Sequence, residues 1–220
     1  MVAVRSSRFG LGAALFAVSL AGWFVASTPP PVQAQQYLSP RFGAQPIPSL
    51  PFTINQCGTY FLRECLTGVS GQNGIFIDAD DVTIDLNGFS LIGVPGSQNA
   101  IAVSSGSSNT RIQNGTIRNW GGSGVIAIQG TNGHFQDLML FDNGSDGLST
   151  GANSVVIDCV AEGNALEGLD LAGNSSIRGC RAVGNGRYGI FANGGTRVVD
   201  NQCRGNGLAG AGAGIRPVGQ

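Results

Sequence analysis

Basic side chains other than arginine are nearly absent from this chain of 220 residues. There is no lysine and a single histidine, His134, and charged residues make up only 11% of the sequence. No basic stripe is present, which disfavours nucleic-acid binding as a function. With one histidine, and cysteine spacings that lack the usual paired pattern, the sequence also predicts no metal site of the zinc type.

Proline is scarce after residue 51. Seven of the nine prolines lie between Pro29 and Pro51, and only Pro95 and Pro217 follow. Strand ladders tolerate few prolines, whereas each of the 36 glycines would cost a helix about 1 kcal/mol. The composition therefore predicts strands and tight turns, preceded by an extended, Pro-rich lead-in at residues 35–51.

A long run of apolar residues occurs only once. Residues 9–26 carry no charge, follow Arg5 and Arg8, and precede Val32-Gln33-Ala34, which offers small residues at a cleavage site. We therefore expect a signal peptide at residues 1–34 and a secreted or periplasmic mature chain without a membrane segment. The alternative is an uncleaved membrane anchor, but glycines dilute the apolar run.

A repeated phrase is what the sequence has in abundance. A small residue followed by an apolar one recurs at spacings of 26, 24, 23, 21 and 21 residues. The phrase occurs at Gly74-Ile75, Ala100-Ile101, Gly124-Val125, Gly147-Leu148, Gly168-Leu169 and Gly189-Ile190. A further start lies either at Gly210 or at Gly214-Ile215. The period is too short for a βαβ unit or a propeller blade, and it predicts one turn of a solenoid built from short strands.

A second apolar–polar phrase follows each start, and from the phrase at 110–119 onward it closes on asparagine. Alignment on that asparagine gives one apolar column of Phe135, Val156, Ile177 and Val198, and another of Leu140, Ala161, Ala182 and Cys203. Coils stacked about 4.8 Å apart would place like residues above one another and bury a shared core. The closing residues Asn143, Asn164, Asn185 and Asn206 are predicted to form a hydrogen-bonded ladder, with neighbouring glycines supplying positive φ.

This pattern resembles the right-handed parallel β-helix repeat proteins of the pectin-lyase-like superfamily, and more closely the bacterial secreted type. The phrase "DDVTIDLNGFSLIG" at 80–93 is similar to an opening coil of that family, and "GTYFLREC" at 58–65 to its capping segment. The resemblance implies an all-β, right-handed parallel β-helix of about six to seven short coils at residues 74–220. It also implies an N-terminal cap at residues 52–73. It implies no single activity, because the superfamily includes lyases, glycosidases, adhesins and non-catalytic members.

The five cysteines would meet an oxidising compartment after export. Cys57 and Cys65 bracket seven residues of the expected cap, and we expect a disulfide between them. Cys159 and Cys180 share an aligned position in adjacent coils, so they are either a disulfide or two stacked free thiols. Cys203 is expected to be a buried single thiol.

Chemistry in the enzymes that this chain resembles takes place on the outer face of one parallel sheet. The outward positions here are expected to be Phe76, Ala102, Ile126, Ser149, Asp170 and Phe191, with Asp146, Glu167 and Tyr188 aligned in the preceding bend. Asp146, Glu167 and Asp170 are the candidate catalytic residues, since paired carboxyl groups act as general acid and base, and three could hold Ca²⁺. Tyr188, Phe191 and Phe76 are the candidate ligand-binding residues, which could stack on sugar rings.

Structural roles compete with each of these assignments. Carboxylates in bends accept backbone hydrogen bonds, and this explanation also covers Asp78, Asp80, Asp81 and Asp85, which otherwise suggest a cation site. The arginine that lyases of this fold use as a base has no assignable counterpart here. The alignment puts the nearby arginines, Arg178, Arg181 and Arg187, on other faces.

Two functions fit the sequence. The first is a secreted, non-catalytic surface module that binds glycans or proteins, or is structural; the second is a carbohydrate-active enzyme, lyase or glycosidase-like, acting on an acidic polysaccharide. A rod of only about 29–34 Å favours the first. No cofactor is expected, apart from the possible Ca²⁺. Unpaired backbone groups on the last coil would also favour self-association through the C-terminal end.

Overall fold

The computed structural model describes residues 43–207 and 214–217, and it consists of strands and turns in these ranges. The chain divides into two units, Met1–Ser39 and Pro40–Gln220, and all described residues lie in the second. The expected signal peptide at residues 1–34 lies outside the described residues. Within the described ranges, no helix is long and apolar enough to cross a membrane.

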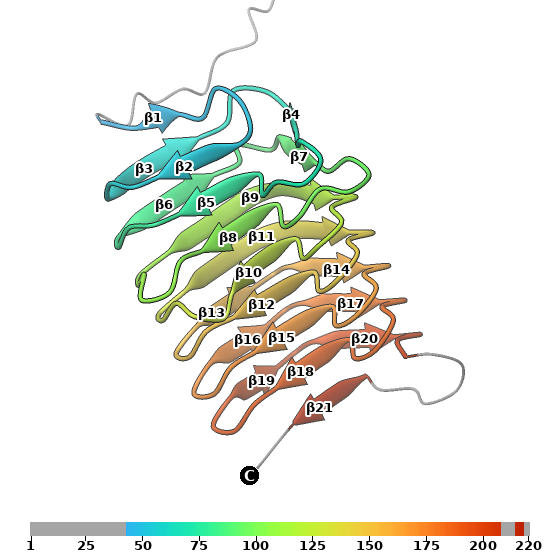
Figure 1. The fold of residues 1–220 in the computed structure, drawn as a ribbon. Coiled ribbons are helices and arrows are strands. Elements are labelled where there is room, and N and C mark those ends of the chain that lie inside the picture. The colour runs from blue at the N-terminus through green and yellow to red at the C-terminus, as the bar shows by residue number, and fades with distance from the viewer. Residues whose placement is uncertain (1–42, 208–213, 218–220) are drawn as a thin grey trace, which may run out of the picture. The chain divides into compact units, whose positions relative to one another are not determined.

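One parallel sheet takes one strand from each coil (Figure 1). In spatial order its eight strands are β2 (Phe52–Ile54), β5 (Ile75–Ile77), β8 (Ile101–Val103), β10 (Val125–Ala127), β12 (Leu148–Thr150), β15 (Leu169–Leu171), β18 (Ile190–Ala192) and β21 (Ile215–Pro217). The six predicted small–apolar phrases lead into β5, β8, β10, β12, β15 and β18. The last coil takes the Gly214-Ile215 register, since Ile215 pairs with Ile190.

A thirteen-stranded parallel sheet forms the remaining flanks and has two branches. The first branch is β1 (Gln45–Pro46), β3 (Gly58–Phe61), β6 (Val82–Asp85), β9 (Arg111–Arg118), β11 (His134–Phe141), β13 (Val155–Ile157), β16 (Ser176–Arg178) and β19 (Arg197–Val199). The second contains β4 (Leu66–Thr67), β7 (Ser90–Ile92), β14 (Val160–Glu162), β17 (Arg181–Val183) and β20 (Gln202–Arg204), and the long strands β9 and β11 belong to both. About seven coils are stacked in this way, which confirms the predicted parallel β-helix.

The residues assigned to a cap and a lead-in take part in the stack. Strands β2, β3 and β4 form a coil that pairs in parallel with β5, β6 and β7. In the described part of the lead-in, β1 pairs with β3, and Ile47 is buried in the core.

The core is made of vertical columns of like residues, as the alignment predicts. Phe135, Val156, Ile177 and Val198 occupy equivalent places in β11, β13, β16 and β19. Leu140, Ala161, Ala182 and Cys203 do so in the second branch. All but the last member of each column are fully buried, so each coil covers the apolar face of the one before it.

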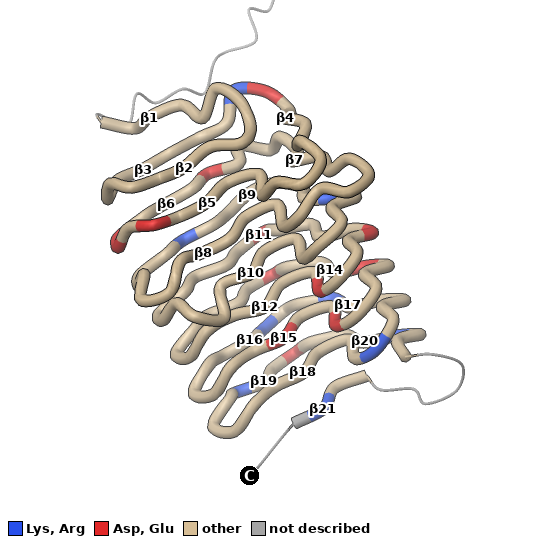
Figure 2. Tube along the Cα trace, in the orientation of Figure 1, with Lys and Arg blue, Asp and Glu red and all other residues tan. Residues whose placement is uncertain are grey.

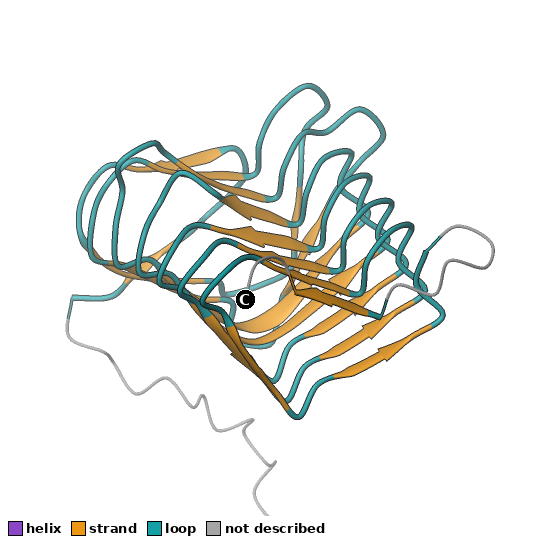
Figure 3. Ribbon diagram, turned by 90° about the horizontal axis from the view of Figure 1, so that it is seen from below, coloured by secondary structure: helices purple, strands orange, loops and turns teal. Residues whose placement is uncertain are grey.

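Three bends turn each coil (Figure 3), and residues in the left-handed region recur at equivalent places in these bends from coil to coil. These residues have φ between 51° and 77° and stack in columns. The columns are Asp81, Asn109, Asn132, Asn153, Asn174 and Gly195; Asn114, Asp137, Asp158, Gly179 and Asp200; and Asn119, Asp142, Gly163, Gly184 and Gly205. Only asparagine, aspartate and glycine adopt this conformation at low cost, which explains why these residues punctuate the sequence.

A buried ladder of asparagine side chains runs alongside the third bend. The amide of Asn143 donates to Oδ1 of Asn164 (2.9 Å), Asn164 donates to Asn185 (2.9 Å), and Asn185 donates to Asn206 (2.8 Å). Each acceptor oxygen also takes the backbone N–H of the preceding asparagine. Trp120, which the repeat pattern does not mark, occupies the same column one coil earlier and donates its backbone N–H to Oδ1 of Asn143.

The ladder explains the glycine that opens each repeat beside it, at Gly124, Gly147, Gly168 and Gly189. A Cβ on Gly147 would stand 2.5 Å from the carbonyl oxygen of Gly168 and 2.9 Å from the amide nitrogen of Asn164. Gly168 is equally crowded by Gly189 and Asn185. Contacts this short exclude a side chain, so glycine is needed beside each rung.

The structure does not show the expected disulfide between Cys57 and Cys65, since all five cysteines are present as free thiols. Both residues are exposed, and the extended strand β3 separates them. The sulfur of Cys65 accepts a hydrogen bond from the backbone of Ser90 (3.4 Å). Cys159 and Cys180 are stacked, buried free thiols, and Cys203 is half-buried.

Replacement of Asn164 by alanine tests the ladder. The substitution removes the acceptor of both the backbone and the side-chain N–H of buried Asn143. Since each unsatisfied buried group costs about 1–3 kcal/mol, the free energy of unfolding should fall by about 3 kcal/mol or more in urea titrations. Asn55→Ala, at an exposed turn position, is the matched control. Equal stability of the two variants would show that the ladder contributes nothing.

Candidate functional site

The outward side chains of the eight-stranded sheet form one continuous column. Strand pairing stacks, in order, Thr53, Phe76, Ala102, Ile126, Ser149, Asp170, Phe191 and Arg216. The part of the column on β5, β8 and β10 is apolar, whereas the part on β12 to β21 is polar, ionisable or aromatic. Phe76 lies five rungs, about 24 Å, from Phe191, so the structure does not bring these two candidate ligand-binding residues together.

The bend before β12 presents Asp146 to the next coil. Its Oδ1 accepts the backbone N–H of Glu167 (3.0 Å), and its Oδ2 accepts the hydroxyl of Ser149 (2.6 Å). Asp146 therefore has a structural role, because it links two coils and fixes the position of Glu167.

Glu167 sits at the equivalent bend one coil later and is only 7% exposed. Burial raises the pKa of its carboxyl group to about 7, and Asp146 adds to the shift through a hydrogen bond between the two carboxyl groups and through its charge. The guanidinium of Arg187, 3.0 Å from Oε1, opposes this rise in pKa. Near neutral pH, Glu167 is thus divided between its neutral and charged forms.

Asp170 lies on β15 between Ser149 and Phe191 in the outward column. Burial raises its pKa to about 6, the charge of Asp146 contributes further, and Arg187 acts in the opposite direction. Asp146, Glu167 and Asp170 therefore form a cluster over two adjacent coils, in which two members can gain or lose a proton near neutral pH. Perturbed groups of this kind mark functional sites more often than ordinary surfaces.

Two aromatic rings and two arginines continue the cluster. The rings of Tyr188 and Phe191 lie 5.6 Å apart, and the guanidinium of Arg216 lies 5.2 Å and 5.8 Å from their centres. Arg216 also donates a hydrogen bond to the hydroxyl of Tyr188. Arg187 lies 6.0 Å from the Tyr188 ring.

Charged segments are sparse along the chain, but acidic and basic ones lie close together around β15 and β17 (Figure 2). The expectation that Arg187 lies on another face is wrong, because its side chain reaches Glu167. Its place next to Tyr188 in the bend was the signal that could have found it. Arg216 was missed because the irregular last coil left its register open.

Three of the four aspartates near the N-terminal end of the β-helix accept hydrogen bonds. Asp80 accepts the backbone N–H and hydroxyl of Ser108, and Asp81 accepts the side-chain amide of Asn109. Asp85 accepts three further N–H groups. In the described part of the chain, no three His, Cys, Asp or Glu side chains converge as a metal site would require.

The raised pKa of Glu167 makes stability depend on pH. A carboxyl group whose folded pKa lies above its ordinary value of 4.5 stabilises the fold when protonated, and this contribution is lost as pH rises toward 7. The free energy of unfolding should therefore fall between about pH 4.5 and pH 7. It should fall less steeply in Glu167→Gln, as measured by denaturant titration; identical pH profiles would contradict the burial of this group.

The coupling between the two bend carboxyl groups can be measured directly. In Asp146→Asn, the pKa of Glu167 should be lower, because the negative charge is removed. Carboxyl-carbon NMR titration reports this value. Asp137→Asn, at an exposed bend of β11, should leave it unchanged. A pKa of Glu167 that stays near 7 without Asp146 would assign the whole shift to burial.

Comparison with protein families agrees with this architecture. No curated protein and no solved structure matches the chain. The family model described as "Right handed beta helix region" matches residues 52–208, which is more than half of the sequence. The chain therefore belongs to the right-handed β-helix family.

Proposed function

We propose that this chain is a non-catalytic binding module whose ligand, a glycan, lies on the outer face of the eight-stranded sheet across β12, β15 and β18. The observation that carries this proposal is the contact between the rings of Tyr188 and Phe191. Phe191 lies next to Asp170 in the outward column of the sheet. The export pattern at residues 1–34 supports a secreted or periplasmic module.

The chemistry of this surface suits a sugar. Aromatic rings offer an apolar face with little conformational freedom to lose, and carboxylates such as Asp170 accept hydrogen bonds from hydroxyl groups. Arg187 and Arg216, whose guanidinium groups lie over the rings, supply N–H donors. A few fixed polar groups around an apolar platform are the usual composition of a small-ligand site.

The hydrogen bonds of the cluster favour binding over catalysis. Both oxygens of Asp146 are engaged by Glu167 and Ser149, and Glu167 is paired with Arg187. Each of these interactions joins adjacent coils or holds a bend. The carboxyl groups of Asp146 and Glu167 therefore hold in place the surface on which the two rings and Asp170 lie.

Substitutions in the column test the binding surface. Phe191→Ala and Asp170→Asn should each weaken the binding of a glycan selected on an array by about tenfold or more, because each removes a central contact. Isothermal titration calorimetry measures the change. Phe141→Ala, on the outer face of the thirteen-stranded sheet, is the matched control. The proposal fails if Phe191→Ala binds as tightly as the unsubstituted chain.

A carbohydrate-active enzyme is the second candidate. It is favoured by the pKa of Glu167 near 7, since a carboxyl group that is partly neutral at that pH can donate a proton to a leaving group. Asp170 or Asp146 would then act as the base or the nucleophile on an acidic polysaccharide.

An absorbance assay for unsaturated uronate and a reducing-sugar assay, on pectate and alginate with and without Ca²⁺, distinguish the two candidates. An enzyme should lose activity in Glu167→Gln but keep it in Glu162→Gln, an exposed glutamate paired with Arg181. Glycan binding that depends on Phe191, with no product from any polysaccharide, would exclude catalysis.

A further inference from the structure

In each coil, one turn leads from the eight-stranded sheet into the first branch of the thirteen-stranded sheet, and these stacked turns form one corner of the β-helix. The turns differ in length from coil to coil. The turn between β8 and β9 has seven residues (104–110), that between β10 and β11 has six (128–133), and that between β12 and β13 has four (151–154). Turns of unequal length cannot lie flat on one another. The mismatch leaves a space under the corner.

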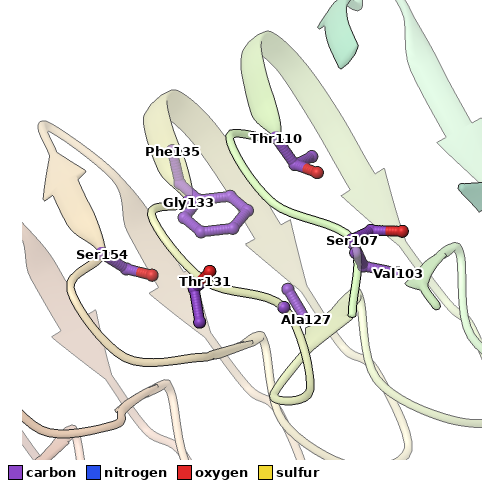
Figure 4. Close-up of a pocket in the computed structure, with 9 residues that line it drawn as sticks. Val103, Ser107, Thr110, Ala127, Thr131, Gly133, Phe135 and Ser154 are labelled. Carbon is purple, nitrogen blue, oxygen red and sulfur yellow. The ribbon is translucent and has the colours of Figure 1, made fainter. Parts of the chain in front are cut away.

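A small cavity lies at this place (Figure 4). It is lined by Val103, Ser107, Thr110, Ala127, Gly130, Thr131, Gly133, Phe135 and Ser154, with hydroxyl groups and the Phe135 ring around it. The space in which the centre of a water molecule could lie is about 10 Å³. This volume is close to the lower limit for one water molecule, and it excludes a larger ligand.

One lining residue has an unused hydrogen-bonding group. The hydroxyl of Thr110 is buried, the residue being 3% exposed, and it has no partner among the described protein atoms. Ser154, also buried, donates its hydroxyl to the carbonyl of Gly151 (2.8 Å) and keeps its acceptor capacity. A buried hydroxyl without a partner is costly.

We propose that the cavity is a binding site for a single water molecule, which the hydroxyl of Thr110 holds together with the other hydroxyl groups of the lining. The water joins three coils at the corner where their turns differ in length. It supplies the hydrogen bonds that direct stacking supplies elsewhere, since a buried water makes two to four bonds to otherwise unpaired groups.

The experiment compares two threonines in the full chain. Thr110→Val removes the hydroxyl at constant shape, and it should lower the melting temperature by about 2–4 °C because a bound water loses a partner. The matched control is Thr150→Val. Thr150 is another buried hydroxyl without a partner, but it does not line the cavity. Its replacement should leave the melting temperature unchanged or raise it.

A high-resolution crystal structure of the unsubstituted chain gives an independent measurement, which does not depend on any variant folding. We expect density for one water oxygen within hydrogen-bonding distance of Thr110 Oγ1. The proposal is overturned if that density is absent. It is also overturned if Thr110→Val stabilises the chain as Thr150→Val does.

Discussion

In-register stacking of one coil on the next is the constraint on which this molecule depends. No coil has enough apolar residues to form a core alone, so burial of Phe135 requires Val156 above it, and burial of Val156 requires Ile177. The same geometry forces polar groups into columns. A buried asparagine is tolerated because an identical asparagine follows one rung later and accepts its hydrogen bond.

The stacking constraint also shapes the candidate site. Bends repeat at fixed places, so Asp146, Glu167 and Tyr188 fall beside the outward face of the sheet in three successive coils. The column of bend residues here contains two acids, Asp146 and Glu167. Burial raises the pKa of Glu167, and the closeness of Asp146 in the neighbouring coil raises it further. The raised pKa of Glu167 thus arises at an ordinary bend position, because this position is buried and both it and its neighbour in the preceding coil are occupied by acidic residues.

The parts of the structure that the sequence predicts are those that repeat. A spacing of 21 residues in the later coils determines which side chains stack, so the apolar columns follow from counting; the strand starts follow from the small–apolar phrase, which recurs at spacings of 21 to 26 residues. Trp120 could not be found in this way, because it replaces the asparagine that marks its column. Arg216 follows a coil of irregular length. The placement of Cys57 and Cys65 was missed for a different reason, since separation along the chain does not reveal that an extended strand lies between two residues.

The unequal corners have a consequence for how such a chain can change. The turn at residues 104–110 is three residues longer than that at 151–154, yet the strands on either side pair in register. The length of the turn at this corner therefore does not affect the register in which the strands pair. Segments inserted there would emerge at the side of the stack without shifting any rung, which makes the corner a natural place to graft a recognition loop.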